Sequence, residues 1–395
     1  MKIDDKKSLK SPSLRFPEFN GEWKEERLSE IADIYKGAGI SKDQLSDNGE
    51  PCILYGELYT KYKTETITEV ISRTDIDNTK LVRSKANDVI IPCSGETAED
   101  IATARCVIKD GILLGGDLNI IRLHNYDGSF VSYQLNGKRK YDIAKVAQGV
   151  SVVHLYGEHL KGVKTVNPCL AEQKKISRFL SLLDERIAVQ NRLIEDLKKL
   201  SCAIVEKMFK QSKTNGRLGD FIEQVSVRNK NGLYSNVLSV SNKQGFVKQS
   251  EQFEDRTVAS EDTSNYKIVK RNNFAYNPAR INVGSIARLT KFDVGIVSPM
   301  YVCFRTKDGI IPEYMEAFFT SQQFFYEMMK RLEGSVRLCL SYEGLCNIPV
   351  YIPNMNKQIV MGQNISLILS KIGLEIEYLG RLHQQKQYLL RKMFI

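Results

Sequence analysis

One stretch of sequence occurs twice and decides the fold. Residues 168–209 read PCLAEQKKISRFLSLLDERIAVQNRLIEDLKKLSCAIVEKMF, and residues 353–394 read PNMNKQIVMGQNISLILSKIGLEIEYLGRLHQQKQYLLRKMF. The correspondence begins at Gly149 and Gly334 and runs without a gap for 61 positions, at a constant offset of 185 residues. Because this period is far longer than a solenoid unit, it predicts two whole domains, each followed by its own helix.

The repeated stretch has the spacing of a coiled-coil helix, with apolar residues at alternating intervals of four and three. The predicted seam of the first helix, 169–209, comprises Ile176, Leu180, Leu183, Ile187, Gln190, Ile194, Leu197, Ser201, Ile204 and Met208. The seam of the second comprises Met361, Ile365, Ile368, Ile372, Glu375, Leu379, Leu382, Lys386, Leu389 and Met393. The 41 residues of the first helix would extend about 60 Å at the usual helical rise.

The two seams most simply pack against each other. In an antiparallel pair, a single register places Gln190 opposite Lys386 and Ser201 opposite Glu375, so that no lone polar group faces Leu or Ile. We therefore expect an antiparallel coiled coil. The alternative is that the two helices bind separate partners and never meet.

Each helix follows a segment of the usual size for one domain. The expected organisation is a tail at 1–17, a first domain at 18–168, a central helix and linker at 169–216, a second domain at 217–353 and a distal helix at 354–395. Short β-like runs lie at 88–91, 119–123, 237–240 and 301–304, and a helical stretch lies at 312–332. This mixture predicts the α+β class. The interiors of the two halves diverge, which suggests two modules that do one job on two different targets.

The composition limits the function classes. A net charge of +10 invites a polyanion, although residues 18–168 carry 19 Lys and Arg against 23 Asp and Glu. The eight cysteines form no CxxC pair and no cluster with histidine, so we expect reduced thiols and no bound metal. The first residues lack the apolar core of a signal peptide, and no uninterrupted run of about 18 apolar residues occurs. We therefore expect a cytoplasmic protein without a membrane span.

Motifs of catalysis are missing from the sequence. It contains no GxxxxGK[ST] phosphate loop and no GxGxxG turn after a strand. The segment Asn277-Pro278-Ala279-Arg280 lacks the second proline and the aromatic residue of the Asn-Pro-Pro-Tyr motif of adenine methyltransferases. We interpret it as a structural turn and expect no catalytic residue in this chain.

Two variable modules, each followed by a repeated long helix, resemble the specificity subunit (HsdS) of Type I restriction–modification systems. The opening run Leu14-Arg15-Phe16-Pro17-Glu18-Phe19 with Trp23 carries part of the resemblance, as does the run from Tyr276 to Ile286. The closing pattern of the family is met by Gly149, Leu155, Leu160, Pro168 and Gln173, and again by Gly334, Leu340, Leu345, Pro353 and Gln358. One departure is that Glu172 of the first copy becomes Lys357 in the second.

The resemblance implies a non-catalytic subunit with two target-recognition domains, each reading one half of a bipartite, asymmetric site in double-stranded DNA. It implies that the helices form a spacer and dock two modification (HsdM) subunits, which carry the S-adenosylmethionine chemistry that methylates adenine N6. A restriction (HsdR) subunit, with its ATP and Mg, would join through them. This chain would bind no cofactor of its own.

Base edges in DNA are read by Arg, Lys, Asn and Gln, whereas phosphate contacts supply most of the affinity. The candidates for DNA contact in the first domain are Arg83, Lys85, Arg105, Lys138, Arg139 and Lys140. Those in the second domain are Arg280, Asn282, Arg288 and Arg337. Two alternatives stay open: 138–140 is a plain solvated loop, and 277–282 merely builds a tight turn. The aromatic stretch 318–326 is expected to be core rather than a platform for stacking bases.

Three other functions compete with this interpretation. A self-contained DNA methyltransferase or nuclease would need the cofactor loop and catalytic groups that the sequence lacks. A scaffold whose coiled coil joins two protein-binding modules would show no salt-dependent DNA affinity. A two-headed DNA-binding regulator would bind DNA but would need no methyltransferase partner.

Overall fold

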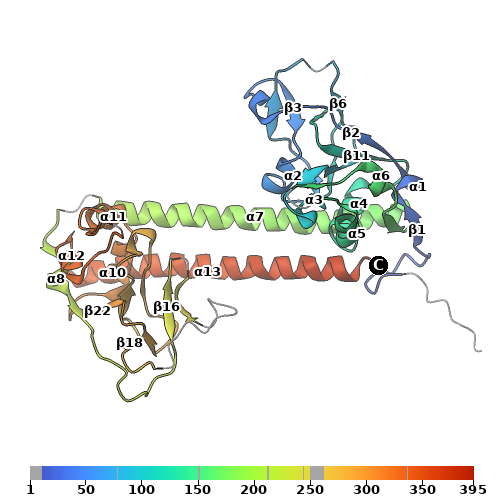
Figure 1. Cartoon of the computed structure of the whole chain (residues 1–395). Coiled ribbons are helices and arrows are strands. Elements are labelled where there is room, and N and C mark those ends of the chain that lie inside the picture. Colours follow the sequence, from blue (N-terminus) through green and yellow to red (C-terminus); the bar gives the residue numbers. More distant parts are fainter. Residues whose placement is uncertain are drawn as a thin grey trace, which may run out of the picture. The chain divides into compact units, whose positions relative to one another are not determined.

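The computed structural model places most of the chain in two compact units. It describes residues 11–77, 79–149, 152–210, 213–242, 244–249, 262–335 and 337–395. The first unit comprises Met1–Asn191 with Tyr378–Ile395, and the second comprises Arg192–Glu377. The long helices α7 (Leu170–Phe209) and α13 (Met355–Lys392) therefore each contribute one end to each unit (Figure 1). This division differs from the linear order of domains and helices expected from the sequence, because a domain core includes the far end of the other helix.

The sheets of the first unit are largely antiparallel. A five-stranded sheet has the order β2-β11-β7-β9-β4 and a four-stranded sheet the order β5-β3-β10-β6, with the further pairs β1-β13 and β12-β8. The strands are β1 (Lys24–Arg27), β2 (Ala32–Lys36), β3 (Glu50–Ile53), β4 (Thr66–Ile67), β5 (Ser72–Thr74), β6 (Val82–Arg83), β7 (Asp88–Pro92), β8 (Ser94–Gly95), β9 (Arg105–Val107), β10 (Leu113–Leu114), β11 (Leu118–Leu123), β12 (Val153–His154) and β13 (Lys164–Asn167). Strands β7 and β11 coincide with two of the β-like runs seen in the sequence.

Short helices surround these sheets. They are α1 (Leu28–Ile31), η1 (Lys42–Gln44), α2 (Glu57–Thr60), α3 (Ala98–Ile101), α4 (Gly128–Asn136), α5 (Lys140–Val146) and α6 (Gly157–Lys161). Helix α4 is nearly all buried and begins where the Asp127 carboxylate accepts a hydrogen bond from the Phe130 amide. An Asp at this position satisfies an amide that the helix itself leaves unpaired.

The second unit contains one four-stranded sheet, β15-β22-β19-β20, and the pairs β14-β23, β16-β17 and β18-β21. Its strands are β14 (Gly216–Arg217), β15 (Ile222–Gln224), β16 (Leu238–Ser241), β17 (Gly245–Lys248), β18 (Lys267–Lys270), β19 (Phe274–Tyr276), β20 (Ile286–Arg288), β21 (Val294–Val297), β22 (Val302–Thr306) and β23 (Pro349–Val350). Its helices, besides the long ones, are α8 (Leu218–Phe221), η2 (Ile281–Val283), α10 (Pro312–Phe319), α11 (Gln322–Met329) and α12 (Tyr342–Cys346). The α+β class predicted from the sequence is confirmed.

The helical stretch expected at 312–332 is two helices rather than one. Helix α10 ends at Phe319, and the Ser321 hydroxyl accepts a hydrogen bond from the Phe324 amide to start α11. A serine that caps a helix start favours a break in the chain direction at this point. The aromatic residues Phe318, Phe319 and Phe324 are buried in one core, as expected, while Phe325 and Tyr326 are exposed.

In each unit, the start of one long helix packs with the end of the other. The core of the first unit contains Ile176, Leu180, Leu183 and Ile187 of α7 together with Leu382, Leu389 and Met393 of α13. The core of the second unit contains Val205 and Phe209 of α7 together with Ile365 of α13. The helices therefore pair antiparallel in both units. Every residue of the two predicted seams is buried or half-buried.

The repeated Lys-Met-Phe at each helix end has a clear structural role. Phe394 packs against Trp23 and Phe130 of the first domain, with ring centroids 6.5 Å and 5.2 Å apart. Phe209 packs in the same way against Tyr314 and Phe318 of the second domain, at 5.4 Å and 5.3 Å. Each long helix therefore ends with an aromatic side chain in the core of the domain that precedes the other long helix in the sequence.

The repeat also fastens each domain to the start of its own helix. Gln173 donates a hydrogen bond to the Pro168 carbonyl and accepts one from the Asp127 amide. Gln358 does the same with the Pro353 carbonyl and the Ile311 amide. Asp127 and Ile311 both stand immediately before a helix of their domain, α4 and α10 respectively. One glutamine per copy thus fixes the angle between the domain and the long helix.

A second repeated contact joins the first segment of each domain to its last segment. The Leu28 amide donates to the Val163 carbonyl, and the Leu218 amide donates to the Ile348 carbonyl, both at 2.9 Å. Val163 and Ile348 are related by the 185-residue offset. Opening and closing segments therefore join in the same way in both halves, although the interiors between them differ.

The glycine that begins the repeat is required by its backbone conformation. Gly149 has φ of 123° and Gly334 has φ of 120°. A Cβ atom at Gly149 would lie 2.1 Å from the Val152 carbonyl oxygen, and one at Gly334 would lie 2.3 Å from the Arg337 carbonyl oxygen. Only glycine adopts such a turn without strain and overlap.

The opening run of the chain holds the start of α7. Arg15 forms two parallel hydrogen bonds of 2.7 Å to the Glu172 carboxylate, and Phe16 packs edge-on against Phe179. Among the described residues, Glu172 is one of the few carboxylates that are fully buried. Lys357 at the equivalent place in α13 could not accept this contact, so the clasp belongs to the first copy alone.

Helix α13 is, within the described ranges, the one helix that is long and apolar enough to cross a membrane by length and composition. This finding differs from the expectation drawn from uninterrupted apolar runs. The criterion is weak evidence, because the core helix of a soluble protein passes the same test. Here the apolar residues of α13 include the seam residues that pack in the two cores.

The seam packing predicts that truncating two neighbouring leucines of α7 has very different effects on the stability of the protein. Leu180 is fully buried and Leu182 is exposed. We expect Leu180→Ala to lower the free energy of unfolding by about 2–5 kcal/mol, because it leaves a cavity, and Leu182→Ala to change it by less than about 0.5 kcal/mol. Chemical denaturation monitored by circular dichroism measures both, and equal losses would contradict the seam.

Candidate nucleic-acid interface

The candidates in the first domain separate into exposed and buried residues. Arg83 and Lys85 are exposed, and Arg83 forms an ion pair with the Glu50 carboxylate at 2.5 Å. Both lie on or next to strand β6, at the edge of the four-stranded sheet. Their side chains remain available to a polyanion, with Arg83 held in place by its partner.

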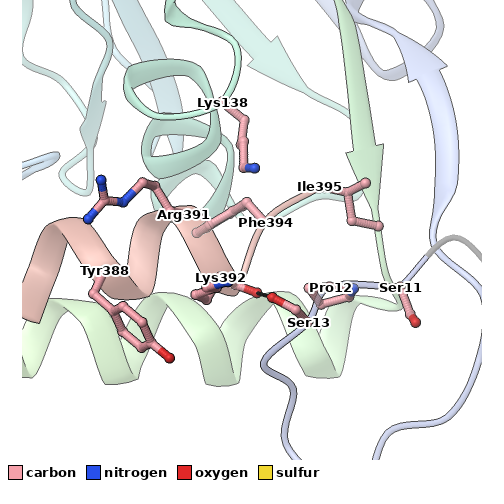
Figure 2. Close-up of a pocket in the computed structure, with 9 residues that line it drawn as sticks. All are labelled: Ser11, Pro12, Ser13, Lys138, Tyr388, Arg391, Lys392, Phe394 and Ile395. Carbon is pink, nitrogen blue, oxygen red and sulfur yellow. Dashed lines mark hydrogen bonds between the residues drawn. The ribbon is translucent and has the colours of Figure 1, made fainter.

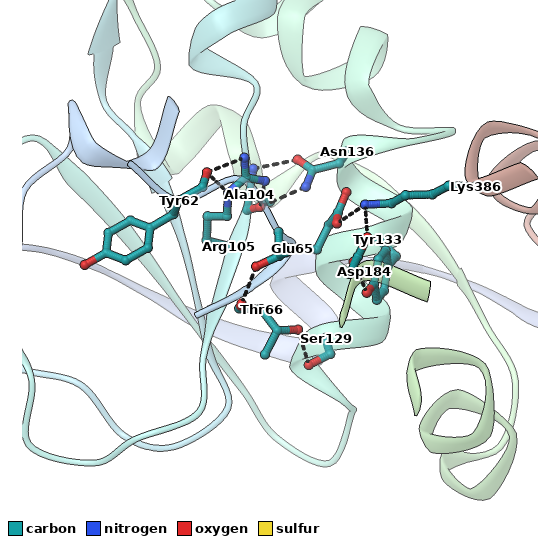
Figure 3. Close-up of polar contacts among 11 residues, drawn as sticks. Tyr62, Glu65, Thr66, Ala104, Arg105, Ser129, Tyr133, Asn136, Asp184 and Lys386 are labelled. Atoms are coloured by element: carbon teal, nitrogen blue, oxygen red, sulfur yellow. Dashed lines mark hydrogen bonds and ion pairs between the residues drawn. The ribbon is translucent and has the colours of Figure 1, made fainter. Parts of the chain in front are cut away.

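Arg105 was a wrong candidate. Its side chain is buried, and its guanidinium donates hydrogen bonds to the Tyr62 and Ala104 carbonyls (Figure 3). Burial lowers the pKa of Arg105, an effect that the carboxylates of Glu65 and Asp184 oppose. An arginine committed to backbone carbonyls inside the fold cannot reach a base or a phosphate.

The basic run 138–140 lies beside the end of α13. Arg139 donates to the Asp142 carboxylate and the Ile395 carbonyl, whereas Lys138 is exposed. Lys138 lines a hollow together with Arg391 and Lys392, which come from α13 (Figure 2). Three cations around one hollow form a local basic patch on a domain whose net charge is negative, and sequence spacing could not bring them together.

Arg280 and Asn282 lie on the turn that follows β19. The Arg280 amide donates to the Asn277 carbonyl, and the Asn277 side chain accepts from the Ala279 amide. The tight turn proposed as the alternative for 277–282 is therefore present, and it leaves the Arg280 side chain exposed. Building a turn and presenting an arginine are compatible roles for this segment.

Arg280 lines a small polar hollow of the second domain. The other lining residues are Ser239, Val240, Ser241, Asn242, Asn277, Val283, Ser285 and Tyr301. Hydroxyl, amide and guanidinium groups of this kind are those that hydrogen-bond to base edges and phosphates. Asn242 and the two serines of β16 were not among the candidates, because strand alternation alone does not show which face of β16 is open.

Arg288 was also a wrong candidate. Its guanidinium is buried and forms ion pairs with Glu313 and Glu316 of α10, the latter at 2.8 Å. It donates a further hydrogen bond to Asn272. Burial raises the pKa of the Glu316 carboxyl, and Arg288 opposes that rise. Arg337 is exposed beside the glycine turn at Gly334.

Four of the eight cysteines, Cys52, Cys93, Cys106 and Cys303, are buried. Burial raises the pKa of Cys52 and Cys93 to about 11 and of Cys106 and Cys303 to about 12. These thiols stay protonated and behave as apolar core residues. Within the described ranges, no group of three His, Cys, Asp or Glu residues is arranged to hold a metal ion.

Comparison with known proteins bears on the first half of the chain directly. Residues 20–199 match the family model for the Type I restriction modification DNA specificity domain. Residues 20–199 therefore contain a Type I restriction modification DNA specificity domain. The matched residues cover the first domain and most of α7, and the internal repeat relates the second helix to the first.

Relatives agree with that assignment. The specificity subunit of the Type I restriction enzyme MjaVIII from Methanocaldococcus jannaschii is 25% identical over 197 residues, which are 50% of this chain and 43% of that protein. The matched stretch thus spans under half of the curated relative's length.

Two solved structures share the fold. The Type I S subunit from M. genitalium aligns with a TM-score of 0.65 at 18% identity, covering 98% of this chain and 99% of that one. A chain solved in work on complex assembly and conformational transition of the type I R-M system aligns with a TM-score of 0.52 at 13% identity, covering 94% and 97%.

A buried and an exposed ion-paired arginine of the second domain, Arg288 and Arg271, predict different changes in stability. We expect Arg288→Met to lower the free energy of unfolding by about 1–3 kcal/mol, because it leaves two partly buried carboxylates without their cation. Arg271→Met removes an exposed ion pair with Asp293 and should change stability by less than about 1 kcal/mol. Thermal unfolding of both variants tests this, and a neutral Arg288→Met would mean that this arginine is free.

Proposed function

We propose that this chain is the DNA-reading subunit of a Type I restriction–modification complex, and that each domain reads one half of a bipartite, asymmetric site. The observation that carries the proposal is the repeated frame around two different interiors. Identical fastening at Gln173 and Gln358 gives both domains the same seat on their helix. Two domains that are attached to their helices in the same way but have different surfaces suit two different half-sites.

We assign DNA contact to exposed basic and polar groups rather than to the whole surface. In the second domain, the group is Arg280 with the polar hollow around it. In the first, it includes Arg83, Lys85 and Lys138. A bidentate arginine contact to a base discriminates by about 1–3 kcal/mol, while lysines serve mostly to bind phosphates.

A second apolar stripe on the long helices supports two copies of one partner. Leu182 and Val189 of α7 are 47% and 60% exposed. Their counterparts at the 185-residue offset, Leu367 and Leu374 of α13, are 69% and 63% exposed. Exposed apolar residues in such an arrangement mark an interaction surface. Because exposed apolar residues recur at equivalent positions in each copy, we propose that the two stripes bind two modification subunits.

The chemistry in this proposal resides in the partners. We propose that the modification subunits bind S-adenosylmethionine and methylate adenine N6, and that a restriction subunit with ATP and Mg joins them in the cytoplasm. This chain contributes recognition and placement: it binds the DNA and holds the partners on its helices. It is not itself the enzyme.

Removing the reading arginine tests the assignment of DNA contact. We expect cells carrying this chain with its partners to contain N6-methyladenine in an asymmetric motif split by unspecified bases. Arg280→Ala should lower methylation at such sites by about 10- to 100-fold or relax the half-site read by the second domain. Arg271→Ala, another exposed arginine of that domain, should leave methylation unchanged. A continuous palindromic motif, or equal effects of the two variants, would contradict the proposal.

Charges placed on the stripes test the assignment of the partner. We expect Leu182→Asp with Val189→Asp to remove one modification subunit, and Leu367→Asp with Leu374→Asp to remove the other, because carboxylates in an apolar contact lose their hydration. Native mass spectrometry of the purified complex counts the subunits. As a control, Leu233→Asp changes an exposed leucine away from the helices and should leave two bound. If both pairs left the count unchanged, a regulator or scaffold without methyltransferase partners would become the better interpretation.

A further inference from the structure

Three buried charges join α13 to the first domain. The Lys386 ammonium of α13 lies 2.6 Å from an Asp184 carboxylate oxygen of α7 and 2.6 Å from a Glu65 carboxylate oxygen (Figure 3). The three side chains are only 7–14% exposed. The Tyr133 hydroxyl donates to Asp184 at 2.6 Å. All four residues belong to the first unit, and the two acids lie outside the predicted seam.

The cluster depends on its single ammonium. Burial raises the pKa of the Glu65 carboxyl, and the positive charge of Lys386 opposes that rise. Burial would lower the pKa of Lys386, but the two carboxylates outweigh it, so that this pKa is raised. Without Lys386, two carboxylates would remain buried side by side. An uncompensated buried charge of this kind is strongly destabilising.

The apolar residues do not distinguish one helix end from the other. Leu382, Leu389, Met393 and Phe394 of α13 correspond, at the 185-residue offset, to apolar residues of α7. Those counterparts are Leu197, Ile204, Met208 and Phe209. The end of α7 from a second copy of this chain could therefore fill the apolar part of the place that the end of α13 occupies in the first unit.

The charged residues do distinguish the two ends. The counterpart of Lys386 is Ser201, which cannot supply a cation, and the counterpart of Asp184 is Leu369. The cluster joins Asp184 of the first copy to Lys386 of the second, and the counterparts Leu369 and Ser201 cannot form its equivalent. Buried polar groups that are satisfied by only one partner are a known means of specifying pairing in coiled coils.

We propose that Lys386 selects which helix end packs in the first unit. Only the end of α13 brings the cation that Asp184 and Glu65 require, so the end of α7 from a second copy is rejected. The repeat makes the two helices interchangeable in shape, and the charge cluster makes them different in energy. Self-association of the chain through two α7 helices is disfavoured as a result.

The test gives the end of α7 the missing cation. Two full-length copies with different affinity tags are co-expressed, and the mixed-tag fraction is measured after purification on one tag, with native mass spectrometry of the product. We expect the unaltered chain to show only background mixing. Ser201→Lys should raise the mixed fraction at least tenfold, because α7 then carries the same ammonium as α13.

Matched variants separate charge from simple disturbance of the seam. Ser201→Met fills the same position without a charge and should not mix. Adding Asp184→Asn to Ser201→Lys should return mixing toward background, since an acid that recognises the cation is gone. Lys392→Ser alters an exposed lysine whose counterpart, Lys207, is also lysine, and should not mix. A folded Ser201→Lys chain that stays unmixed, or equal mixing of Ser201→Met, overturns the proposal.

A direct measurement on Lys386 complements the mixing test. Lys386→Ser should speed amide hydrogen exchange over residues 378–392 at least tenfold relative to Lys392→Ser, because the end of α13 loses its charged anchor. Unchanged exchange would contradict the role of Lys386. None of these measurements involves DNA or a modification subunit, so their outcome is independent of the proposed function.

Discussion

The structure depends on the antiparallel packing of two amphipathic helices, each of which completes the core of a domain that it does not follow. Phe394 packs with Trp23 and Phe130, and Phe209 packs with Tyr314 and Phe318. Burial of apolar surface drives this exchange of helix ends. The core of the first unit includes residues from the far end of the chain, and the core of the second includes the end of α7, which immediately precedes the second domain in the sequence.

A structural feature could be predicted from the sequence when its pattern lies within one continuous stretch, and could not when it depends on residues far apart in the chain. The heptad spacing and the repeated glutamines are visible within one stretch, and the helices, the α+β class and several strands followed from such patterns. Arg105 and Arg288 show the limit. Their partners, the Tyr62 carbonyl and the acids of α10, lie tens of residues away or on the backbone. Residue type predicts that an arginine can bind DNA, but only the fold shows that these two are already paired.

The molecule combines a symmetric frame with asymmetric polar contacts. Closing hydrogen bonds, helix-start glutamines and terminal phenylalanines occur in both copies. The Arg15–Glu172 clasp and the Lys386 cluster occur in the first unit. The counterpart of Glu172 in the second copy is Lys357, and the counterpart of Lys386 in the first copy is Ser201. Apolar packing thus sets the architecture that the two halves share, and a few buried charges distinguish the ends of the two long helices. This division is expected, because apolar contact is insensitive to partner identity while a buried charge requires one particular neighbour.

The fastening points have a consequence for how such a chain can vary. Leu28 and Val163 join at the rim of the first domain, and Leu218 and Ile348 join at the rim of the second. The hydrogen bonds that join opening to closing lie at these rims, and the anchoring glutamines lie in the repeat. The interior supplies further contacts to the helices, such as those of Asp127, Phe130 and Glu65. The interior can therefore accumulate substitutions, or be exchanged whole, as long as these few contacts are kept.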